Sequence, residues 1–165
     1  MVLSMASGIS GANSRTISRG SNWTQSSYAR PAQLTTSLAG ANNDLTYMAK
    51  AYSSASNNIR IRYVVAGAST PLTVSVSSND ITVNVATNGS SAATSAAAQV
   101  AAAVLASTPA MALLGSVDNA PGNDGTGVVA ALGFTNLAGG ADNDWARGSG
   151  TWNRRSVGKS FSTIS

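Results

Sequence analysis

The sequence predicts an α+β fold: a small antiparallel sheet of about four to six strands, packed by one Ala-rich helix and a short second helix, with extended N- and C-terminal arms. Two observations predict this class. Residues 72–85 alternate apolar and polar side chains, as strands with one buried face do. Residues 90–107 then change to helical spacing, with apolar side chains three and four positions apart.

The chain divides into a central domain between two arms. Residues 1–42 are rich in Ser, Ala, Asn, Gly, Thr and Arg and keep neither a strand nor a helix period. We therefore predict an extended N-terminal arm that is ordered only by what it touches. Residues 43–140 carry the periodic segments and form the predicted α+β domain. Residues 141–165 return to the composition of the first arm.

The first half of the domain predicts about four consecutive antiparallel strands. Residues 44–52 (DLTYMAKAY) and 58–66 (NIRIRYVVA) give the first two, and residues 72–86 fold back as a hairpin. A two-residue loop at Ser78-Asn79 sets apolar residues opposite one another, and Asn79 tolerates the positive φ that such loops need. The expected pairs are Val76 with Ile81, Val74 with Val83, and Leu72 with Val85.

Two helices follow the hairpin. The longer one is predicted within residues 90–107, capped by Ser91 or Thr94. The shorter one, TPAMALLG, has Thr108 as its cap and Gly115 at its end. The expected buried stripe of the long helix is Ala97, Val100, Ala101, Val104 and Leu105, and the expected core residues of the short one are Met111, Leu113 and Leu114.

The last part of the domain is ambiguous. Residues 118–127 (DNAPGNDGTG) predict a loop. Periodicity does not distinguish strand from helix over residues 128–138, because the apolar run is short. We favour one or two short closing strands, with Gly139-Gly140 marking the end of the domain.

The composition removes most catalytic chemistry. The chain has no His and no Cys, and all six of its acidic residues are Asp. The commonest general base, the thiol nucleophile and the principal transition-metal ligands are therefore missing. Ser nucleophiles lack a His to activate them, and neither Lys50 nor Lys159 lies in a segment that suggests burial. We expect a protein that is not an enzyme and that needs no cofactor and no metal.

Three polar motifs have simple structural interpretations. GNDGTG at residues 122–127 lacks the Lys-Ser of a phosphate loop and the Glu of a calcium loop, which favours a flexible turn. Asp142 and Asp144 lie in a polar segment that desolvates neither carboxylate, which favours a solvated linker. Arg60 and Arg62 lie on one face of a predicted strand, opposite Ile61 and its neighbours. That face is either a small basic patch or, as we favour, an ordinary solvated face.

The positive charge belongs to the two ends of the chain. Residues 1–40 contain three Arg and no acid, whereas residues 141–165 contain four basic residues and two Asp. Arg beside Trp is typical of anchors in protein interfaces. Basic arms with aromatic residues also bind nucleic acid, but these charges are spread thinly, so we favour protein partners. The predicted contact residues are Arg15, Arg19, Trp23, Arg30, Trp145, Trp152, Arg154 and Arg155.

No segment predicts a membrane span or a secretory signal. The least polar stretch, residues 92–114, contains Gln99 and is interrupted at Pro109, so a pair of soluble helices fits it better. Residues 1–10 lack the basic start and apolar centre of a signal. We therefore expect no membrane partner.

Three segments of the domain follow one another in a distinctive order. They are NDLTYMAKAYSSASNNIRIRYVVAG, LTVSVSSNDITVNVATNGSSAATSAAAQVAAAVLAS and GNDGTGVVAALGFTNLAGG. This order resembles a domain found in virion proteins of tailed bacteriophages. The resemblance covers about residues 43–140 and excludes both arms. It implies a non-enzymatic building block of the particle, usually a decoration or capsid-associated protein of the head.

Composition and resemblance lead to the same expectation: a capsid decoration or cement protein docked through its arms. Its expected partners are the major capsid protein and neighbouring virion subunits, with a homo-oligomer on the particle. Synthesis in the host cytoplasm and a final place on the virion surface follow. The alternatives are a tail or head–tail junction component, and a small module that binds cell-surface glycan. A glycan module needs exposed aromatic residues on the domain, for which Tyr47, Tyr52 and Tyr63 are candidates and two look core-facing.

Overall fold

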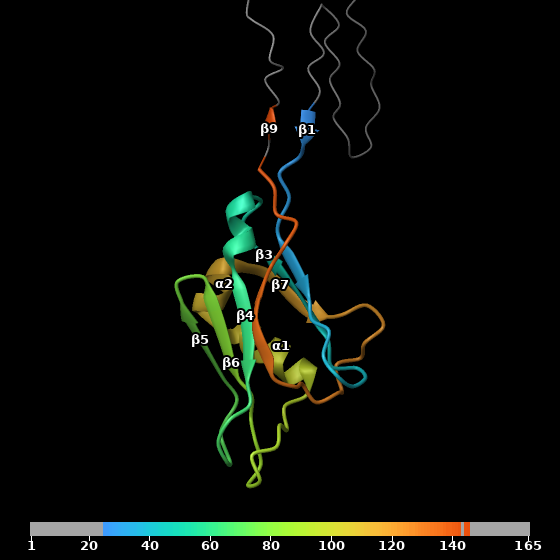
Figure 1. Cartoon of the computed structure of the whole chain (residues 1–165), viewed down its shortest axis with the longest axis vertical. Helices are drawn as coiled ribbons and strands as arrows, with labels where there is room; N and C mark the ends of the chain where they lie inside the picture. Colours follow the sequence, from blue (N-terminus) through green and yellow to red (C-terminus); the bar gives the residue numbers. More distant parts are fainter. Residues whose placement is uncertain (1–24, 143, 146–165) are drawn as a thin grey trace, which may run out of the picture. The chain divides into compact units, whose positions relative to one another are not determined.

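The computed structural model describes residues 25–142 and 144–145. The compact unit runs from Ser27 to Asp144. Its strands form a three-stranded and a four-stranded sheet, whose orders are β2-β3-β7 and β5-β6-β4-β8 (Figure 1). The strands of the first sheet are β2 (Gln33–Thr35), β3 (Leu45–Ala49) and β7 (Leu114–Asn119). Those of the second are β4 (Arg60–Val64), β5 (Thr73–Ser77), β6 (Asp80–Asn84) and β8 (Leu132–Asn136).

Three helical segments complete the unit. They are the 3-10 helix η1 (Ser54–Asn58), α1 (Ala97–Ala106) and α2 (Thr108–Leu113). α1 packs against β7 and β5, and α2 packs against the same two strands. The short strands β1 (Gln25–Ser27) and β9 (Asp144–Trp145) pair with each other. The α+β class and the two α-helices expected from the sequence are confirmed.

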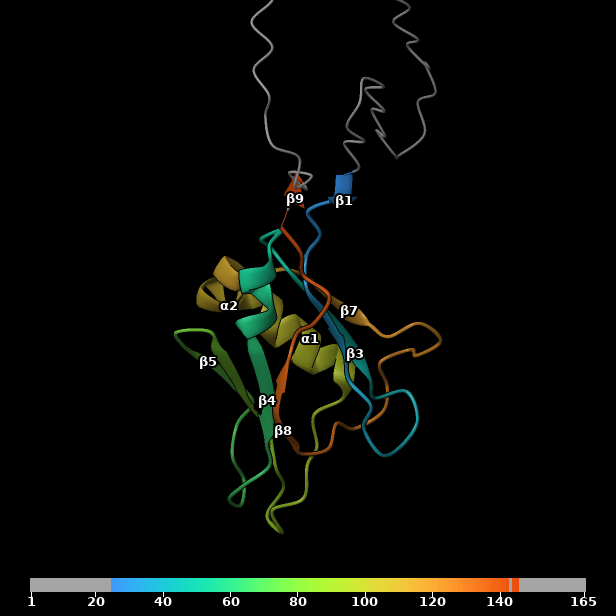
Figure 2. The same ribbon diagram turned by 45° about the horizontal axis from the view of Figure 1, so that its top comes forward.

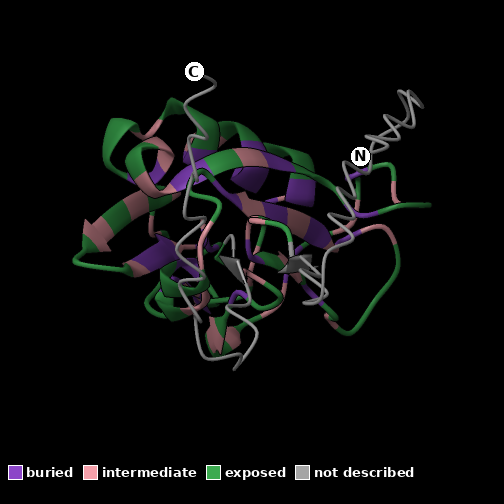
Figure 3. Ribbon diagram, turned by 90° about the horizontal axis from the view of Figure 1, so that it is seen from above, coloured by how far each residue is buried: buried purple, intermediate pink, exposed green. Residues whose placement is uncertain are grey.

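One hydrophobic core joins the two sheets and α1 (Figures 2 and 3). Alternate residues of β3 and β4 are buried, because successive side chains of a strand point to opposite faces, whereas β6 buries Ile81, Thr82 and Val83 in a row. The largest buried side chains come from β3, β4 and β6, from the inner face of α1, and from β7. They include Leu45, Tyr47, Ile61, Tyr63, Ile81, Val83, Val100, Val104, Leu114 and Val117.

The pairing of the predicted strands differs from four consecutive antiparallel neighbours. β3 and β4 belong to different sheets, with η1 between them. β4 runs parallel to β6, which lies between β4 and β5. Alternation along a strand indicates which face is buried but not which strand lies beside it. Arg60 in β4 lies opposite Asp80 in β6, and periodicity does not reveal a contact between residues so far apart in the sequence.

The β5–β6 hairpin has the predicted register, with Val74 opposite Val83 and Val76 opposite Ile81. The positive φ of 54° falls on Ser78 and not on Asn79. The expected pair Leu72–Val85 lies beyond the ladder, which ends at Thr73 and Asn84. Pro71 has no N–H to donate, so the next hydrogen-bonded pair in this register cannot form.

The helices are confirmed with corrections at their ends. Leu105 was expected in the buried stripe of α1 but is 47% exposed. Adjacent helical residues are about 100° apart, so Val104 faces the core and Leu105 does not. α1 begins after Ala96, whose N–H is bound by the Gln99 side chain at 2.9 Å, and neither Ser91 nor Thr94 caps it.

The second helix is capped one residue earlier than predicted. The Ser107 hydroxyl, and not that of Thr108, accepts from the Ala110 N–H at 3.4 Å. Gly115 does not end α2 but lies inside β7, a strand that the sequence did not reveal. Of the predicted core residues, Leu114 is buried, whereas Met111 and Leu113 are partly buried against the core.

The predicted domain boundary at residue 43 lies too far along the chain. β2 pairs with β3, from Gln33 opposite Met48 to Thr35 opposite Thr46. Ala32 is fully buried. β2 has only three residues, so no period could distinguish it from the polar segment around it. The rest of the predicted arm, residues 1–24, lies outside the described residues, as do 143 and 146–165.

A buried hydrogen bond links the two sheets. The hydroxyls of Tyr47 in β3 and Tyr63 in β4 are 2.6 Å apart, and both side chains are buried. Burial raises the pKa of both phenols, so neither ionises under ordinary conditions. Each hydroxyl therefore remains a neutral polar group whose partner is the other.

Removal of the Tyr47 and Tyr63 hydroxyls should have non-additive effects on the free energy of unfolding. Tyr47→Phe leaves the Tyr63 hydroxyl buried without this partner and should cost about 1–3 kcal/mol of unfolding free energy. The double variant with Tyr63→Phe should cost less than the sum of the single variants. Urea unfolding measures all three, with Tyr52→Phe as an exposed control; additive losses would contradict the interpretation.

Candidate protein-interaction surface

The outer side of the four-stranded sheet carries the most distinctive charged cluster on the described domain. Ile61 and Tyr63 of β4 point into the core, so Arg60 and Arg62 point outward, as their alternation predicts. The parallel pairing with β6 sets Asp80 opposite Arg60 and Thr82 opposite Arg62. We call Arg60, Arg62, Asp80, Thr82 and Phe134 the arginine face.

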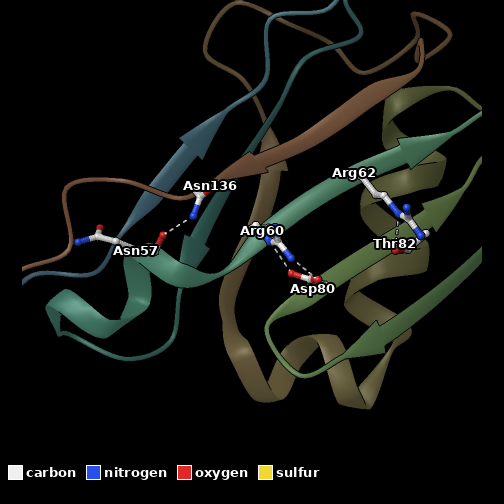
Figure 4. Close-up of polar contacts among 6 residues, drawn as sticks. All are labelled: Asn57, Arg60, Arg62, Asp80, Thr82 and Asn136. Carbon is white, nitrogen blue, oxygen red and sulfur yellow. Dashed lines mark hydrogen bonds and ion pairs between the residues drawn. The ribbon is translucent and has the colours of Figure 1, made fainter.

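Both arginines are held by β6 (Figure 4). The Arg60 guanidinium donates from Nε and Nη2 to the two carboxylate oxygens of Asp80, each at 2.6 Å. Arg62 donates from Nε to the Thr82 hydroxyl at 2.9 Å. A two-pronged contact of this kind fixes the plane of a guanidinium as well as its position. The arginines are therefore oriented side chains on a face that stays solvent-exposed, as the sequence led us to expect; the Arg60 side chain is 42% exposed.

Phe134 of β8 brings the two guanidinium groups together. The Cζ atoms of Arg60 and Arg62 lie 4.5 and 4.4 Å from the centre of its ring. Guanidinium groups at this distance are attracted to an aromatic ring. The β4–β8 pairing shifts register between Ile61 and Tyr63, next to the strand position of Arg62. Phe134 could not be singled out from the sequence, since it lies in the segment where strand and helix could not be distinguished.

Electrostatics agree with this geometry. The hydrogen bonds and charge of Arg60 hold the pKa of Asp80 below its usual value, and Arg62 adds a smaller effect in the same direction. The bond to Asp80 raises the pKa of Arg60 in turn. The face thus carries two guanidinium groups and a single carboxylate, that of Asp80. The Nη atoms of Arg62 have no hydrogen-bond partner among the residues that the structure describes, so they are open to an acceptor on another molecule.

A shallow polar depression of about 410 Å³ adjoins the arginine face. Arg60 and Asp80 form one side, and the turn residues Ser78 and Asn79 form another. Asn136 lies here too, where its amide donates to the Asn57 carbonyl at 2.9 Å. The lining offers amide, hydroxyl, guanidinium and carboxylate groups, and more polar than apolar surface. Such a lining suits contact with polar side chains or backbone better than enclosure of a small apolar ligand.

The two terminal segments of the described domain lie side by side. Arg30 and Ala141 exchange two backbone hydrogen bonds of 3.0 Å, and Gln33 and Ala138 exchange two of 2.8 Å. The Arg30 Nε also donates to the Gly139 carbonyl at 2.7 Å. Beyond these residues in the sequence, β1 pairs with β9. The chain therefore enters and leaves the domain as an antiparallel pair.

Asp142 fastens this exit to the domain. Its carboxylate accepts from the Ser54 N–H at 3.1 Å and from the Ser54 hydroxyl. These bonds lower the pKa of Asp142. Asp142 is solvent-exposed, as predicted, but its contact with Ser54 holds it on the domain and not in a free linker. Ser54 lies in η1, far away in sequence, which is why local composition could not reveal the contact.

The predicted contact residues have different outcomes. Arg30 is inside the domain and binds its own chain through Gly139. The backbone of Trp145 lies in β9. The predictions for the remaining six lie outside the described residues. These six are Arg15, Arg19, Trp23, Trp152, Arg154 and Arg155.

The GNDGTG loop is a helix cap and not a flexible turn. The carbonyls of Gly125 and Gly127 accept from the first N–H groups of α1, those of Ala98 and Ala97, each at 2.9 Å. These donors have no partner within the helix. Asp124 turns back to bind Thr126, which lowers the pKa of its carboxyl. The N–H groups at the start of α1, which could otherwise bind a phosphate, are therefore already bonded to the loop.

Two further features bear on function. Tyr47 and Tyr63 are buried, whereas Tyr52 is 61% exposed and Phe134 is 41% exposed. In the described part of the chain, no group of three acidic residues is placed to hold a metal ion. Neither α1 nor α2 is long enough to cross a bilayer, and the described residues contain no other α-helix.

Comparison with protein-family models, with curated proteins and with solved structures finds no match. We therefore infer function from the residues and geometry of this chain, together with the resemblance seen in its sequence.

The loop beside α1 should tolerate no side chain at Gly127. A Cβ there would lie 2.1 Å from the Ala41 carbonyl oxygen, so backbone must move. We expect Gly127→Ala to lower the unfolding free energy by at least about 2 kcal/mol. Gly133→Ala is the matched control, because nothing lies within 4 Å of its Cβ. Equal thermal stability of the two variants would contradict this role.

Removing each arginine should raise the pKa of Asp80 by different amounts. Arg60→Ala removes both hydrogen bonds and should move this pKa close to its ordinary value, whereas Arg62→Ala should move it less. Because folding lowers this pKa, the pair stabilises the fold above about pH 4, and that contribution is lost as pH falls through the folded pKa. NMR titration of the Asp80 carboxyl carbon measures both shifts. Equal shifts would mean that Arg60 is not its principal partner.

Proposed function

We propose that the protein is a non-enzymatic structural component of a tailed-bacteriophage particle, a capsid decoration or cement protein that docks through its terminal arms. The observation that carries this proposal is the antiparallel pairing of the two terminal segments at Arg30–Ala141 and Gln33–Ala138. Both arms begin at one place on the domain. The two arms can therefore bind the same region of a particle while the domain stays on the particle's outer surface.

Three other features support a role in assembly. The arms hold most of the basic residues and all three Trp, the residue types that anchor protein interfaces. The arginine face adds two oriented cations on the domain itself. Many copies on a symmetric shell make weak contacts collectively durable, so no single contact need be strong.

A glycan-binding module fits the domain less well. Phe134 is an exposed aromatic beside a polar depression, which such a module needs. Arg60 and Arg62 already lie against its ring, which leaves less of the ring for a sugar to stack on. Tyr52 belongs to neither the depression nor the arginine face. We therefore favour protein partners, with a tail or head–tail location as the alternative place in the particle.

Anchor residues of the C-terminal arm should decide whether the protein stays on particles. In the triple variant Trp152→Ala, Arg154→Ala and Arg155→Ala, we expect particle occupancy to fall at least tenfold, because buried aromatic and paired Arg contacts dominate such interfaces. Mass spectrometry of purified particles measures copies relative to the major capsid protein. The same count in the unmodified protein separates a head location, with many copies, from a tail location, with few.

The matched control changes interleaved residues of the same arm, Asn153→Ala with Ser156→Ala. It should leave occupancy unchanged, and circular dichroism should show that both variants keep a folded domain. Undiminished occupancy of the triple variant would contradict docking through this arm.

A further inference from the structure

β5 is an uncovered edge of the four-stranded sheet. It pairs with β6 on one side only, and no helix or strand lies beyond it in either view (Figures 1 and 2). Its ladder is regular from Thr73–Asn84 to Ser77–Asp80, with no register shift. Val74 and Val76 on its inner side are only partly buried against the core. β5 therefore has unpaired backbone groups and partly exposed apolar side chains that another strand could contact.

The direction of the unpaired backbone groups follows from the turn. A two-residue loop makes the closing pair Ser77–Asp80 a hydrogen-bonded one, and such pairs alternate along an antiparallel ladder. Thr73, Ser75 and Ser77 therefore direct their N–H and C=O groups towards β6. Val74 and Val76 direct theirs away from the sheet, where the described domain supplies no strand to meet them.

The other described edges carry features that discourage pairing. β7 bears Asp118, and its ladder with β3 has a register shift. The ladder of β8 with β4 is also shifted. Beyond β3, β2 is bonded at Gln33 to Ala138. β5 has none of these features, and the chain has no charged residue between Arg62 and Asp80.

We propose that β5 is the pairing edge for a second copy of this chain. The two strands run antiparallel about a two-fold axis at Ser75. The sequence TVSVS suits this axis, because it places Val74 opposite Val76 of the second copy and Ser75 opposite its own equivalent. The outward N–H and C=O groups of Val74 and Val76 then face their counterparts, which gives four hydrogen bonds across the axis.

Side chains and charge favour the same arrangement. Each half-exposed Val meets a Val of the other copy, so apolar surface on the core side is covered. Neither strand carries charge, so no repulsion opposes a symmetric contact. The contact is small, which implies weak association in solution that many copies on one assembly would strengthen. This inference holds whether or not the assembly is a phage particle.

A disulfide can trap this contact in the full-length protein, which has no cysteine of its own. Ser75 is exposed, so Ser75→Cys should not disturb the fold. At the axis, the two Cα atoms of a non-hydrogen-bonded pair would lie about 4.5 Å apart, within the range that a disulfide spans. Under mild oxidation we expect a covalent dimer, seen on non-reducing gels and by intact mass.

Ser77→Cys is the matched control on the same face of the same strand. In the proposed register, its two copies lie roughly 13 Å apart, too far for a disulfide. We expect Ser75→Cys to cross-link at least about tenfold faster. Equal rates would indicate random collision and overturn the proposal. Faster cross-linking of Ser77→Cys would also overturn it, because the strands would then pair in another register or β5 would meet another surface.

A charge exchange tests the axis without oxidation. Ser75→Lys alone and Ser75→Glu alone should each weaken self-association in sedimentation experiments, because like charges would meet at the axis. A mixture of the two variants should restore it through Lys–Glu pairs. Association that ignores both substitutions, or a mixture no better than either variant, would overturn the proposal.

Discussion

The hydrogen bond between the Tyr47 and Tyr63 hydroxyls is the constraint on which the rest of the domain depends. It is buried and joins a strand of each sheet, and each phenol would be costly to bury without a partner. The bond therefore fixes how β3 and β4 face each other across the core. Apolar packing alone tolerates several alignments of two sheets, whereas a buried polar pair favours one.

β4 carries Tyr63 of this hydrogen bond on its inner side and the two arginines on its outer side. Tyr63 and Ile61 anchor its inner side, so the alternation of the strand leaves Arg60 and Arg62 on the outer side. β6 and β8 flank β4 and supply Asp80, Thr82 and Phe134 around the two guanidinium groups. Because β4, β6 and β8 belong to one sheet, their pairing holds the two arginines beside these partners. The interior pair and the exterior face are thus two sides of one strand.

The sequence predicted what depends on local pattern and missed what depends on pairing over distance. It revealed the hairpin register and both helices, because alternation and helical spacing lie within short windows. It did not reveal the parallel β4–β6 pairing, β2 or β7. β2 has three residues, and β7 reads as LGSVDN, with a Gly and no clear alternation.

In the candidate site too, features of local pattern could be predicted and long-range contacts could not. The outward direction of Arg60 and Arg62 could be read from their spacing. Their partners could not, since Asp80 lies twenty positions from Arg60 and Phe134 is farther still. The exit clamp of Ser54 and Asp142 spans 88 positions and leaves no local trace. Such contacts depend on strand order, which a single sequence specifies only through its whole fold.

Strand order also separates the two surfaces proposed for assembly. In the four-stranded sheet, β5 and β8 are opposite edges. The chain continues from β8 into Ala138 and Ala141, which pair with Gln33 and Arg30, so the paired termini lie on the β8 side. β5 remains open at the other side. The paired segments at Arg30–Ala141 and Gln33–Ala138 therefore do not occupy the β5 edge, and the two proposals call on different sides of the four-stranded sheet.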